Sequence, residues 1–452
     1  MTNLFFKLLM TISFGACLVA CGSSDDKDEE TSYSESYVQF YNGSAASALT
    51  YMRIVDGKTL GSAVYGDVTS LLTVESGNVG LEFYRQDSDN KEVIVDELQV
   101  NFKTGQKSLL ILSGQNQELS EHTFAREELT NKFRLFASSV VEGDSQYDVY
   151  MADAGESFTE AHKLGTLGYQ DFTELSYWGG SAGDNFSLGD YVIYLTLPGQ
   201  TSAIFQSTPV KFSFSTEYAL VIRATAGANS GNLEVDLVAN SSSVATYPDV
   251  NESAQYRVYN SIDASLSVTL AGSGDNQNTL DVAAKTISDF NSLSFGNYRL
   301  SASLVNDNSV GFNNHFVTLN QGESKALVLY YNADNVLSSL AFNESTLPQS
   351  YQFQIEIANL ITDFSSLEIY FIRANETLDT AKYHVSALNF AKTKSITLPD
   401  DNYEILVLAE SEGTQLLLER SAQIAFEQGK NHIISLEKDS TSAAGYAIRL
   451  LN

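Results

Sequence analysis

The stretch "VNFKTGQKSLLIL" (Val100–Leu112) has the pattern of a β-hairpin. Gly105 lies between two strand-like segments and supplies the positive-φ residue that a tight reversal needs. Three similar hairpins follow along the chain. They are "KFSFSTEYALVI" turning at Thr216, "VTLNQGESKALVL" turning at Gly322 and "AFEQGKNHIISL" turning at Gly429. The hairpin is therefore one part of a repeated β unit.

Two further landmarks accompany each hairpin. The first is an alternating strand that opens the unit, as in "YVQFYNGS", "FRLFASS", "YRVYNSI" and "FQIEIAN", which begin at Tyr37, Phe133, Tyr256 and Phe353. The second is a turn that leads into another alternating strand, at Gly77, Gly189, Gly296 and Asp401, with nearly equal spacing to the four hairpins. These glycines and the Asp401-Asn402 pair are expected to supply the positive-φ residue of the turn. Units of roughly 100 residues with this pattern have the size of an immunoglobulin-type sandwich.

The repeat and the composition together predict an all-β protein of four tandem Ig-like antiparallel β-sandwiches. Tyr (24) and Phe (25) are plentiful, and runs with a helical apolar period are scarce. Seven or so strands per unit are expected, with alternate side chains buried against the facing sheet. The residues expected in such positions include Leu109, Ile111, Val221, Leu327, Leu329 and Ile433.

The repeat also divides the chain into domains. Sandwiches are expected at residues 37–116, 131–240, 254–342 and 351–452. Residues 113–132 form an acidic linker with one short possible helix near Phe124 to Leu129, and residues 239–254 and 342–350 form polar linkers that contain Pro.

The N-terminus has the three parts of a secretory signal. "LLMTISFGACLVA" (Leu8–Ala20) is an apolar core too short to span a bilayer permanently. The sequence Leu18-Val19-Ala20-Cys21 resembles the lipobox of bacterial lipoproteins. The resemblance implies a signal peptide over residues 1–20 and a diacylglycerol thioether on Cys21, whose new amine is acylated as well.

The same resemblance implies a location. Gly22 follows the cysteine in place of the Asp that retains such lipoproteins in the inner membrane, so the expected site is the bacterial outer membrane, facing the periplasm or the cell surface. Residues 21–36 are then an acidic tether, too hydrophilic to fold. Two or three acyl chains suffice for stable anchoring.

The repeated units resemble the bacterial family called domain of unknown function 4397, whose members are small Ig-like sandwiches in secreted and lipid-anchored proteins. The resemblance is carried by Tyr41-Asn42-Gly43-Ser44 and Val64-Tyr65-Gly66-Asp67-Val68-Thr69 in the first unit and by Tyr147-Asp148-Val149-Tyr150 and Gly189-Asp190-Tyr191 in the second. Tyr259-Asn260-Ser261 and Gly296-Asn297-Tyr298 continue it in the third unit, and Asn402-Tyr403 in the fourth. It implies a fold and a setting, and no catalytic residues.

Several classes of function are disfavoured by the sequence. A formal charge of −30 argues against nucleic acid as a partner. Both cysteines, Cys17 and Cys21, lie before the folded units, which leaves those units without a thiol nucleophile or a thiolate metal site. The five histidines are scattered singly, and nucleotide-binding or hydrolase motifs are absent. The sequence therefore predicts no enzyme, no cofactor and no metal.

Two weaker binding signals remain. The loops at Asp87, Asp89 and Asn90 and at Asp275, Asn276 and Asp281 carry oxygen ligands that could hold calcium, although such loops are mostly ordinary turns. "ELSYWGGSAGDNF" (Glu174–Phe186) places Tyr177 and Trp178 beside two glycines, where they could bind a sugar or a partner surface, or close the end of their own sandwich.

These observations favour a noncatalytic, lipid-anchored envelope protein used in adhesion or scaffolding, with a membrane contact through Cys21 and an unidentified envelope partner. The alternative is a glycan-binding envelope protein that uses loop aromatics, and a hydrolase has the least support.

Overall fold

The structure is a computed structural model that describes residues 35–181, 183–274 and 276–452. These residues form strands in eight sheets, and their helices are the single 3-10 turns Phe158–Glu160, Gly227–Asn229 and Leu378–Thr380. The expected all-β fold of tandem sandwiches is confirmed. The expected signal peptide, Cys21 and most of the expected tether lie outside the described residues. Within the described part, none of the helices has the length and apolar character to cross a bilayer.

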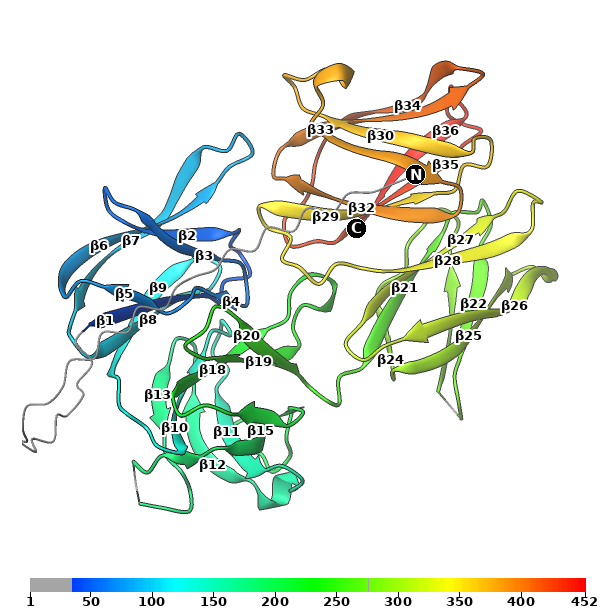
Figure 1. The fold of residues 1–452 in the computed structure, drawn as a ribbon. Coiled ribbons are helices and arrows are strands. Elements are labelled where there is room, and N and C mark those ends of the chain that lie inside the picture. Colours follow the sequence, from blue (N-terminus) through cyan, green and yellow to red (C-terminus); the bar gives the residue numbers. More distant parts are fainter. Residues whose placement is uncertain (1–34, 182, 275) are drawn as a thin grey trace, which may run out of the picture.

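Sandwich 1 covers residues 36–125 and appears in blue to cyan in Figure 1. One sheet has the order β4-β1-β8-β9, with β5 also paired to β1, and the other has the order β3-β2-β6-β7. Its strands are β1 (Ser36–Asn42), β2 (Thr50–Ile54), β3 (Thr59–Ala63), β4 (Asp67–Val68), β5 (Leu72–Val74), β6 (Gly77–Gln86), β7 (Glu92–Phe102), β8 (Gln106–Ser113) and β9 (Glu118–Ala125).

Sandwich 2 covers residues 132–248 and is larger. Its sheets have the orders β13-β10-β18-β19-β20, with β14 also on β10, and β12-β11-β15-β16, with β17 also on β15. Its strands are β10 (Lys132–Ser139), β11 (Tyr147–Asp153), β12 (His162–Leu167), β13 (Phe172–Leu175), β14 (Phe186–Ser187), β15 (Gly189–Thr196), β16 (Phe205–Gln206), β17 (Val210–Phe212), β18 (Glu217–Ala224), β19 (Leu233–Val238) and β20 (Val244–Pro248).

Sandwiches 3 and 4 share one regular arrangement of eight strands each. The sheets of sandwich 3 have the orders β24-β21-β27-β28 and β23-β22-β25-β26, and those of sandwich 4 have the orders β32-β29-β35-β36 and β31-β30-β33-β34. The strands of sandwich 3 are β21 (Ala254–Asn260), β22 (Leu266–Ala271), β23 (Gln277–Val282), β24 (Asn291–Leu293), β25 (Gly296–Leu304), β26 (Asp307–Leu319), β27 (Ser324–Tyr331) and β28 (Leu337–Asn343). Those of sandwich 4 are β29 (Gln352–Asn359), β30 (Ser366–Ile372), β31 (Tyr383–Asn389), β32 (Lys392–Pro399), β33 (Asn402–Ser411), β34 (Thr414–Ala425), β35 (His432–Lys438) and β36 (Tyr446–Leu451).

Each sandwich contains one parallel pair, which the prediction of purely antiparallel sheets did not include. The opening strand runs parallel to the strand after the repeated turn at Gly105, Thr216, Gly322 or Gly429, in the pairs β1–β8, β10–β18, β21–β27 and β29–β35. A parallel pair needs a long connection, and the strands that lie between the two partners in sequence supply it through the opposite sheet. We call the sheet that contains the parallel pair the docking sheet and the other one the outer sheet.

The expected linkers contain two strands that the sequence analysis missed. Residues 118–125 form β9, so the short helix expected near Phe124 to Leu129 is wrong, and residues 244–248 form β20. Sandwich 1 accordingly extends past residue 116, and sandwich 2 past residue 240. β9 is polar along most of its length, and it is held by pairing with β8 along eight residue pairs. Such an edge strand carries little apolar signal.

The turns agree only in part with the glycine argument. Gly105, Gly322 and Gly429 have φ values of 74°, 64° and 75°, as a tight reversal requires. The expected hairpins are wrong, because each turn carries the chain from one sheet of the sandwich to the other, so that β7 and β8, like β26 and β27, lie in different sheets and do not pair. Gly189 in sandwich 2 and the Asp401-Asn402 pair in sandwich 4 were expected to have positive φ as well, and they are not among the positive-φ positions of the described residues.

An asparagine at the end of the opening strand joins the two sheets. Asn260 Nδ2 donates to the carbonyls of Ala264 (2.8 Å) and Val282 (3.0 Å), and its Oδ1 accepts from the amide of Ile262 (3.0 Å). Asn42 and Asn359 make the corresponding bonds to the ends of β3 and β31. This amide satisfies backbone groups that would otherwise be buried without a partner.

A tyrosine fixes the second landmark. In sandwich 2 the hydroxyl of Tyr191 donates to the carbonyl of Ser187 (2.7 Å), and in sandwich 4 Tyr403 donates to Pro399 (2.9 Å). Tyr298 donates to Ser294 in the same way in sandwich 3. The bond spans four residues and resembles the tyrosine corner of immunoglobulin sandwiches. The turn-Tyr pattern of the sequence therefore fixes the packing at the start of β15, β25 and β33.

Asn260→Ala should destabilise sandwich 3 by about 1–3 kcal/mol, because it leaves buried carbonyls and the Ile262 amide without their partner. Hydrogen-exchange mass spectrometry of the full chain would show faster exchange in β21 and β23. Asn343→Ala, an exposed position at the end of β28, is the control and should leave exchange unchanged. Equal protection in the Asn260→Ala variant and the native chain would contradict the role of this amide.

Candidate functional site

The sandwiches are docked in pairs through their docking sheets. In the 1–2 pair, one apolar cluster contains side chains from both sandwiches. Sandwich 1 contributes Tyr41, Val68, Leu109, Ile111 and Phe124, and sandwich 2 contributes Phe136, Val140, Ala219, Val221 and Val238. The rings of Phe124 and Phe136 stack at a centroid distance of 4.1 Å. The docking sheet of each sandwich is therefore covered on both faces, once by its own outer sheet and once by the neighbour.

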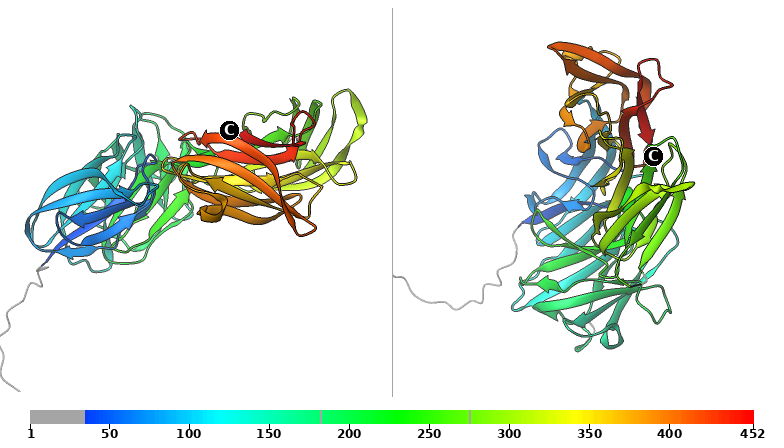
Figure 2. Two further views of the ribbon diagram at one scale, coloured as in Figure 1. Left: turned by 90° about the horizontal axis from the view of Figure 1, so that it is seen from above. Right: turned by 90° about the vertical axis from the view of Figure 1, so that its right-hand side faces the viewer.

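Sandwiches 3 and 4 repeat this arrangement, and the two pairs form the two lobes visible in Figure 2. Tyr259, Ala326, Val328 and Tyr330 of sandwich 3 pack with Leu360, Ile433 and Leu451 of sandwich 4. The six side chains expected to be buried against the facing sheet of their own sandwich do not all lie there. Leu327 and Leu329 lie in the core of their own sandwich, whereas Leu109, Ile111, Val221 and Ile433 are buried against the neighbouring sandwich.

A buried tyrosine–carboxylate bond crosses the 1–2 interface. The hydroxyl of Tyr41 donates to Oδ2 of Asp236 (2.6 Å), which also accepts from Nε of Arg223 (2.7 Å). Thr246 donates to the other oxygen of Asp236 (2.6 Å). Tyr41 and Asp236 are both fully buried. Burial and the Asp236 carboxylate raise the pKa of Tyr41 well above its ordinary value.

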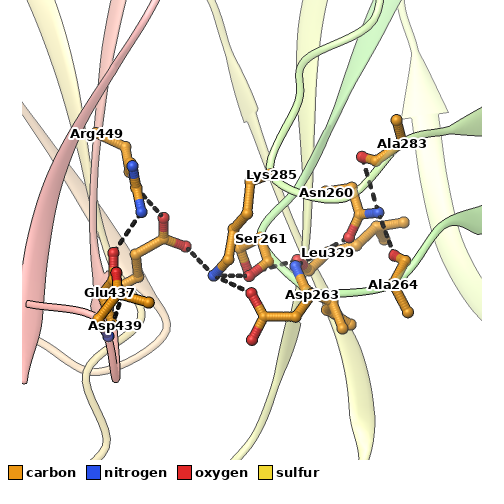
Figure 3. Close-up of polar contacts among 12 residues, drawn as sticks. Asn260, Ser261, Asp263, Ala264, Ala283, Lys285, Leu329, Glu437, Asp439 and Arg449 are labelled. Atoms are coloured by element: carbon orange, nitrogen blue, oxygen red, sulfur yellow. Dashed lines mark hydrogen bonds and ion pairs between the residues drawn. The ribbon is translucent and has the colours of Figure 1, made fainter.

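The 3–4 interface has the matching bond at the matching position. Tyr259, like Tyr41, precedes the asparagine that ends the opening strand, and its hydroxyl donates to Oε1 of Glu437 (2.9 Å). Figure 3 shows Glu437 between Arg449 (3.1 Å) and Lys285 (3.5 Å), with Lys285 also donating to the Ser261 carbonyl (2.6 Å). Burial raises the pKa of Glu437, and burial with the Glu437 carboxylate raises the pKa of Tyr259.

The segment between sandwiches 3 and 4 is anchored and lines two cavities. Arg257 forms a bidentate ion pair with Glu344, in which Nε and Nη2 donate to the two carboxylate oxygens (2.7 and 2.6 Å). The guanidinium of Arg85 lies 3.8 Å from the ring centre of Tyr351. Tyr65 and Leu347 line both cavities, whose volumes are about 340 and 310 Å³. The first is bounded by sandwiches 1, 2 and 3, and the second by sandwiches 1 and 4. Their walls exist only when the pairs are assembled.

The aromatic loop of sandwich 2 lies against its own core. Trp178 is half-buried, and its ring stacks on that of His162 at 4.9 Å and meets the edges of Phe186 (6.1 Å) and Tyr191 (6.0 Å). Tyr177 is half-buried beside it, at a centroid distance of 4.8 Å. The two rings close the end of the sandwich, so the structure does not favour a sugar platform at this place.

The loops considered for calcium are held by other bonds. Asp87 accepts from the amides of Asp89 (2.9 Å) and Lys91 (2.8 Å), and the carboxylate of Asp89 pairs with Lys91 (3.1 Å) and lies 3.6 Å from Arg373 of sandwich 4. Asp275 lies outside the described residues. No group of three or more acidic, His or Cys side chains suited to a metal occurs in the described part of the chain.

One histidine belongs to the docking interface, a role that its isolated position in the sequence did not suggest. His122 of β9 stacks on Phe172 of sandwich 2 at 4.4 Å, and its Nε2 lies 3.0 Å from the Ser120 hydroxyl. Burial lowers the pKa of His122 to about 4. The only signal in the sequence is the His-x-Phe alternation that places His122 and Phe124 on one face of β9.

Comparison with known proteins adds little. No family model and no curated protein matches the chain. Among solved structures there is a match to a "putative cell adhesion protein from Bacteroides ovatus", which is 7% identical and covers 48% of this chain and 97% of that one, with a TM-score of 0.22. A match of this quality carries no argument. The resemblances to lipoproteins and to domain of unknown function 4397 therefore stay predictions.

Tyr259→Phe should weaken the 3–4 pair at neutral pH by about 1.5–3 kcal/mol, the usual size of a hydrogen bond to a charged group. The stability that the raised pKa of Tyr259 provides is fully present below pH 10 and is lost as the pH rises through the higher folded-state pKa. The variant should therefore lose less stability than the native chain between pH 8 and pH 11, by up to about 1.4 kcal/mol for each pH unit above 10.

Urea unfolding followed by circular dichroism at several pH values measures both effects. Tyr331→Phe is the control, because it removes a phenol hydroxyl from β27 that is not a donor to Glu437. An alkaline slope that is the same in the native chain and in Tyr259→Phe would rule out the proton linkage at this tyrosine.

Proposed function

We propose that this protein is a lipid-anchored, noncatalytic envelope protein whose four sandwiches form a rigid scaffold for adhesion or for holding an envelope partner. The observation that carries the proposal is that buried polar groups of this protein lie at the contacts between sandwiches. Tyr41, Asp236, Tyr259 and Glu437 lie between sandwiches and hold them together. Perturbed groups that gather in a cleft favour catalysis, whereas here they serve docking.

The docked pairs also support a scaffold. Apolar clusters and buried ion pairs restrict rotation between neighbouring sandwiches, which flexible linkers alone would allow. Contacts such as Arg85 on Tyr351 and Gln117 to the Tyr351 hydroxyl (3.2 Å) connect sandwich 1 to the start of sandwich 4. A partner bound to one sandwich would then be held at a fixed distance from the other three.

Cys21→Ser tests the anchor. A palmitate analogue should label the native protein and leave the variant unlabelled, because the proposed thioether needs the Cys21 thiol. The native protein should sediment with the outer membrane, and the variant, with its sandwiches intact, should be released into the soluble fraction. Crosslinking on intact cells should capture a partner with the native protein alone.

The control is Cys17→Ser, since Cys17 lies within the expected signal peptide and is removed with it. Labelling that persists in Cys21→Ser, or a native protein that takes up no label, would contradict the anchor. Turnover of a saccharide or ester substrate by the purified protein would contradict the noncatalytic part of the proposal.

A further inference from the structure

A buried lysine of sandwich 1 contacts an amide of sandwich 2. Lys107 lies at the start of β8 on the face that meets sandwich 2, and it is only 2% exposed. Its Nζ lies 2.8 Å from Oδ1 of Asn240, the second residue after the end of β19. The ring of Phe124 lies 5.8 Å from the same Nζ. An amine and a carboxamide are thus held together in a largely dry interface.

The amide of Asn240 is fixed in one orientation. Its Nδ2 donates to the Thr216 hydroxyl (2.7 Å) and to Oε2 of Glu217 (3.1 Å), so its oxygen faces Lys107. Gln39 of β1 donates to the carbonyls of both flanking residues, Ala239 (3.0 Å) and Ser241 (2.9 Å). The backbone and side chain of Asn240 are therefore positioned before any reaction, which is the main requirement for reaction between two neighbouring groups.

The electrostatic setting suits a nucleophilic amine beside a carboxylate that can relay a proton. Burial lowers the pKa of Lys107 to about 7, so a large share of this side chain is the neutral amine at physiological pH. Burial favours the neutral form of Glu217, but Arg126 (3.5 Å) and hydrogen bonds from Asn240 and the Glu127 amide outweigh it and lower the pKa of that carboxyl. The side chain of Glu217 is 1% exposed and touches the nitrogen that would leave.

We propose that Nζ of Lys107 and Cγ of Asn240 form an amide cross-link that joins sandwiches 1 and 2 covalently. The lone pair of Nζ attacks Cγ, and the Cγ–Nδ2 bond breaks. Nζ gives up one proton, Nδ2 takes up one, and Nδ2 leaves as ammonia. The Glu217 carboxylate accepts a hydrogen bond from Nδ2 and interacts electrostatically with Lys107, so it is placed to take up the proton that Nζ loses and to pass it to Nδ2. The reaction is a transamidation, and it consumes no oxidant and no other reactant.

The molecule contains its own comparison site. Lys325 lies on β27 of sandwich 3, the counterpart of β8, but it points to the face that meets its own outer sheet, and Ser324 occupies the position of Lys107. The Nζ of Lys325 donates to the Thr318 carbonyl (2.8 Å) and pairs with Glu323 (3.1 Å), both in the same sandwich. Neither of these two partners is a side-chain amide. Lys325 should therefore stay unlinked.

Peptide mapping of the full-length protein tests the proposal. After digestion with trypsin, the peptides that contain Lys107 and Asn240 should be recovered as one linked species, lighter than their sum by one ammonia molecule. Cleavage after Lys107 should be lost, and cleavage after Lys325 should be normal. Lys107→Met and Asn240→Ala should each abolish the linked species.

Glu217→Gln separates the chemistry from the packing, because it keeps the shape of the side chain and removes its acid. It should reduce the linked fraction at least tenfold while hydrogen exchange in β8 and β19 stays near native. Separate, unmodified peptides from the natively folded wild-type protein would overturn the cross-link. Full linkage in Glu217→Gln would overturn the role of Glu217.

Discussion

The burial of the docking sheets on both faces is the constraint on which the rest of the structure depends. A sandwich that stands alone needs one apolar face on each sheet, and the other face contacts water. Here the strands after the repeated turns carry continuous apolar runs, such as Leu109 to Leu112 in β8 and Ala326 to Leu329 in β27. Half of these side chains fill their own core, and the other half need a neighbour. A sandwich separated from its partner would expose that second apolar face.

The polar groups of the interfaces make the docking selective. Tyr41 and Tyr259 occupy the same position in sandwiches 1 and 3, and Ser138 and Ala358, which are small, occupy it in sandwiches 2 and 4. Each pair thus combines one tyrosine with one small residue and one buried carboxylate. A buried carboxylate is costly unless its hydrogen-bonding capacity is satisfied, and a wrong pairing of sandwiches would deprive Asp236 or Glu437 of its tyrosine donor.

The two pairs stabilise their carboxylates and amines by different means. In the 3–4 pair, the amine of Lys285 faces the carboxylates of Glu437 and Asp263, and Tyr331 and Asn332 line the same cavity. In the 1–2 pair, Lys107 has a carboxamide as its nearest polar partner and an aromatic ring beside it. Charge pairing suits the first environment, and reaction with an amide suits the second. A covalent link in the pair nearer the expected tether would keep that pair closed under a pulling force.

Sequence alone determined the number of sandwiches, the turns at Gly105, Gly322 and Gly429, and the all-β class, because turn residues and strand alternation are local properties of the chain. The sequence showed Asn42 and Tyr191 as parts of a repeated pattern, and their hydrogen bonds in the structure explain why those residue types are needed there. The tertiary structure decided which side chains face a neighbour. Period-two alternation cannot show whether the second face of β8 meets water or another sheet, and β9 carries too few apolar residues to be recognised. Lys107 and Asn240 are 133 positions apart in the sequence, and they come into contact only because sandwiches 1 and 2 dock, which no local sequence pattern predicts.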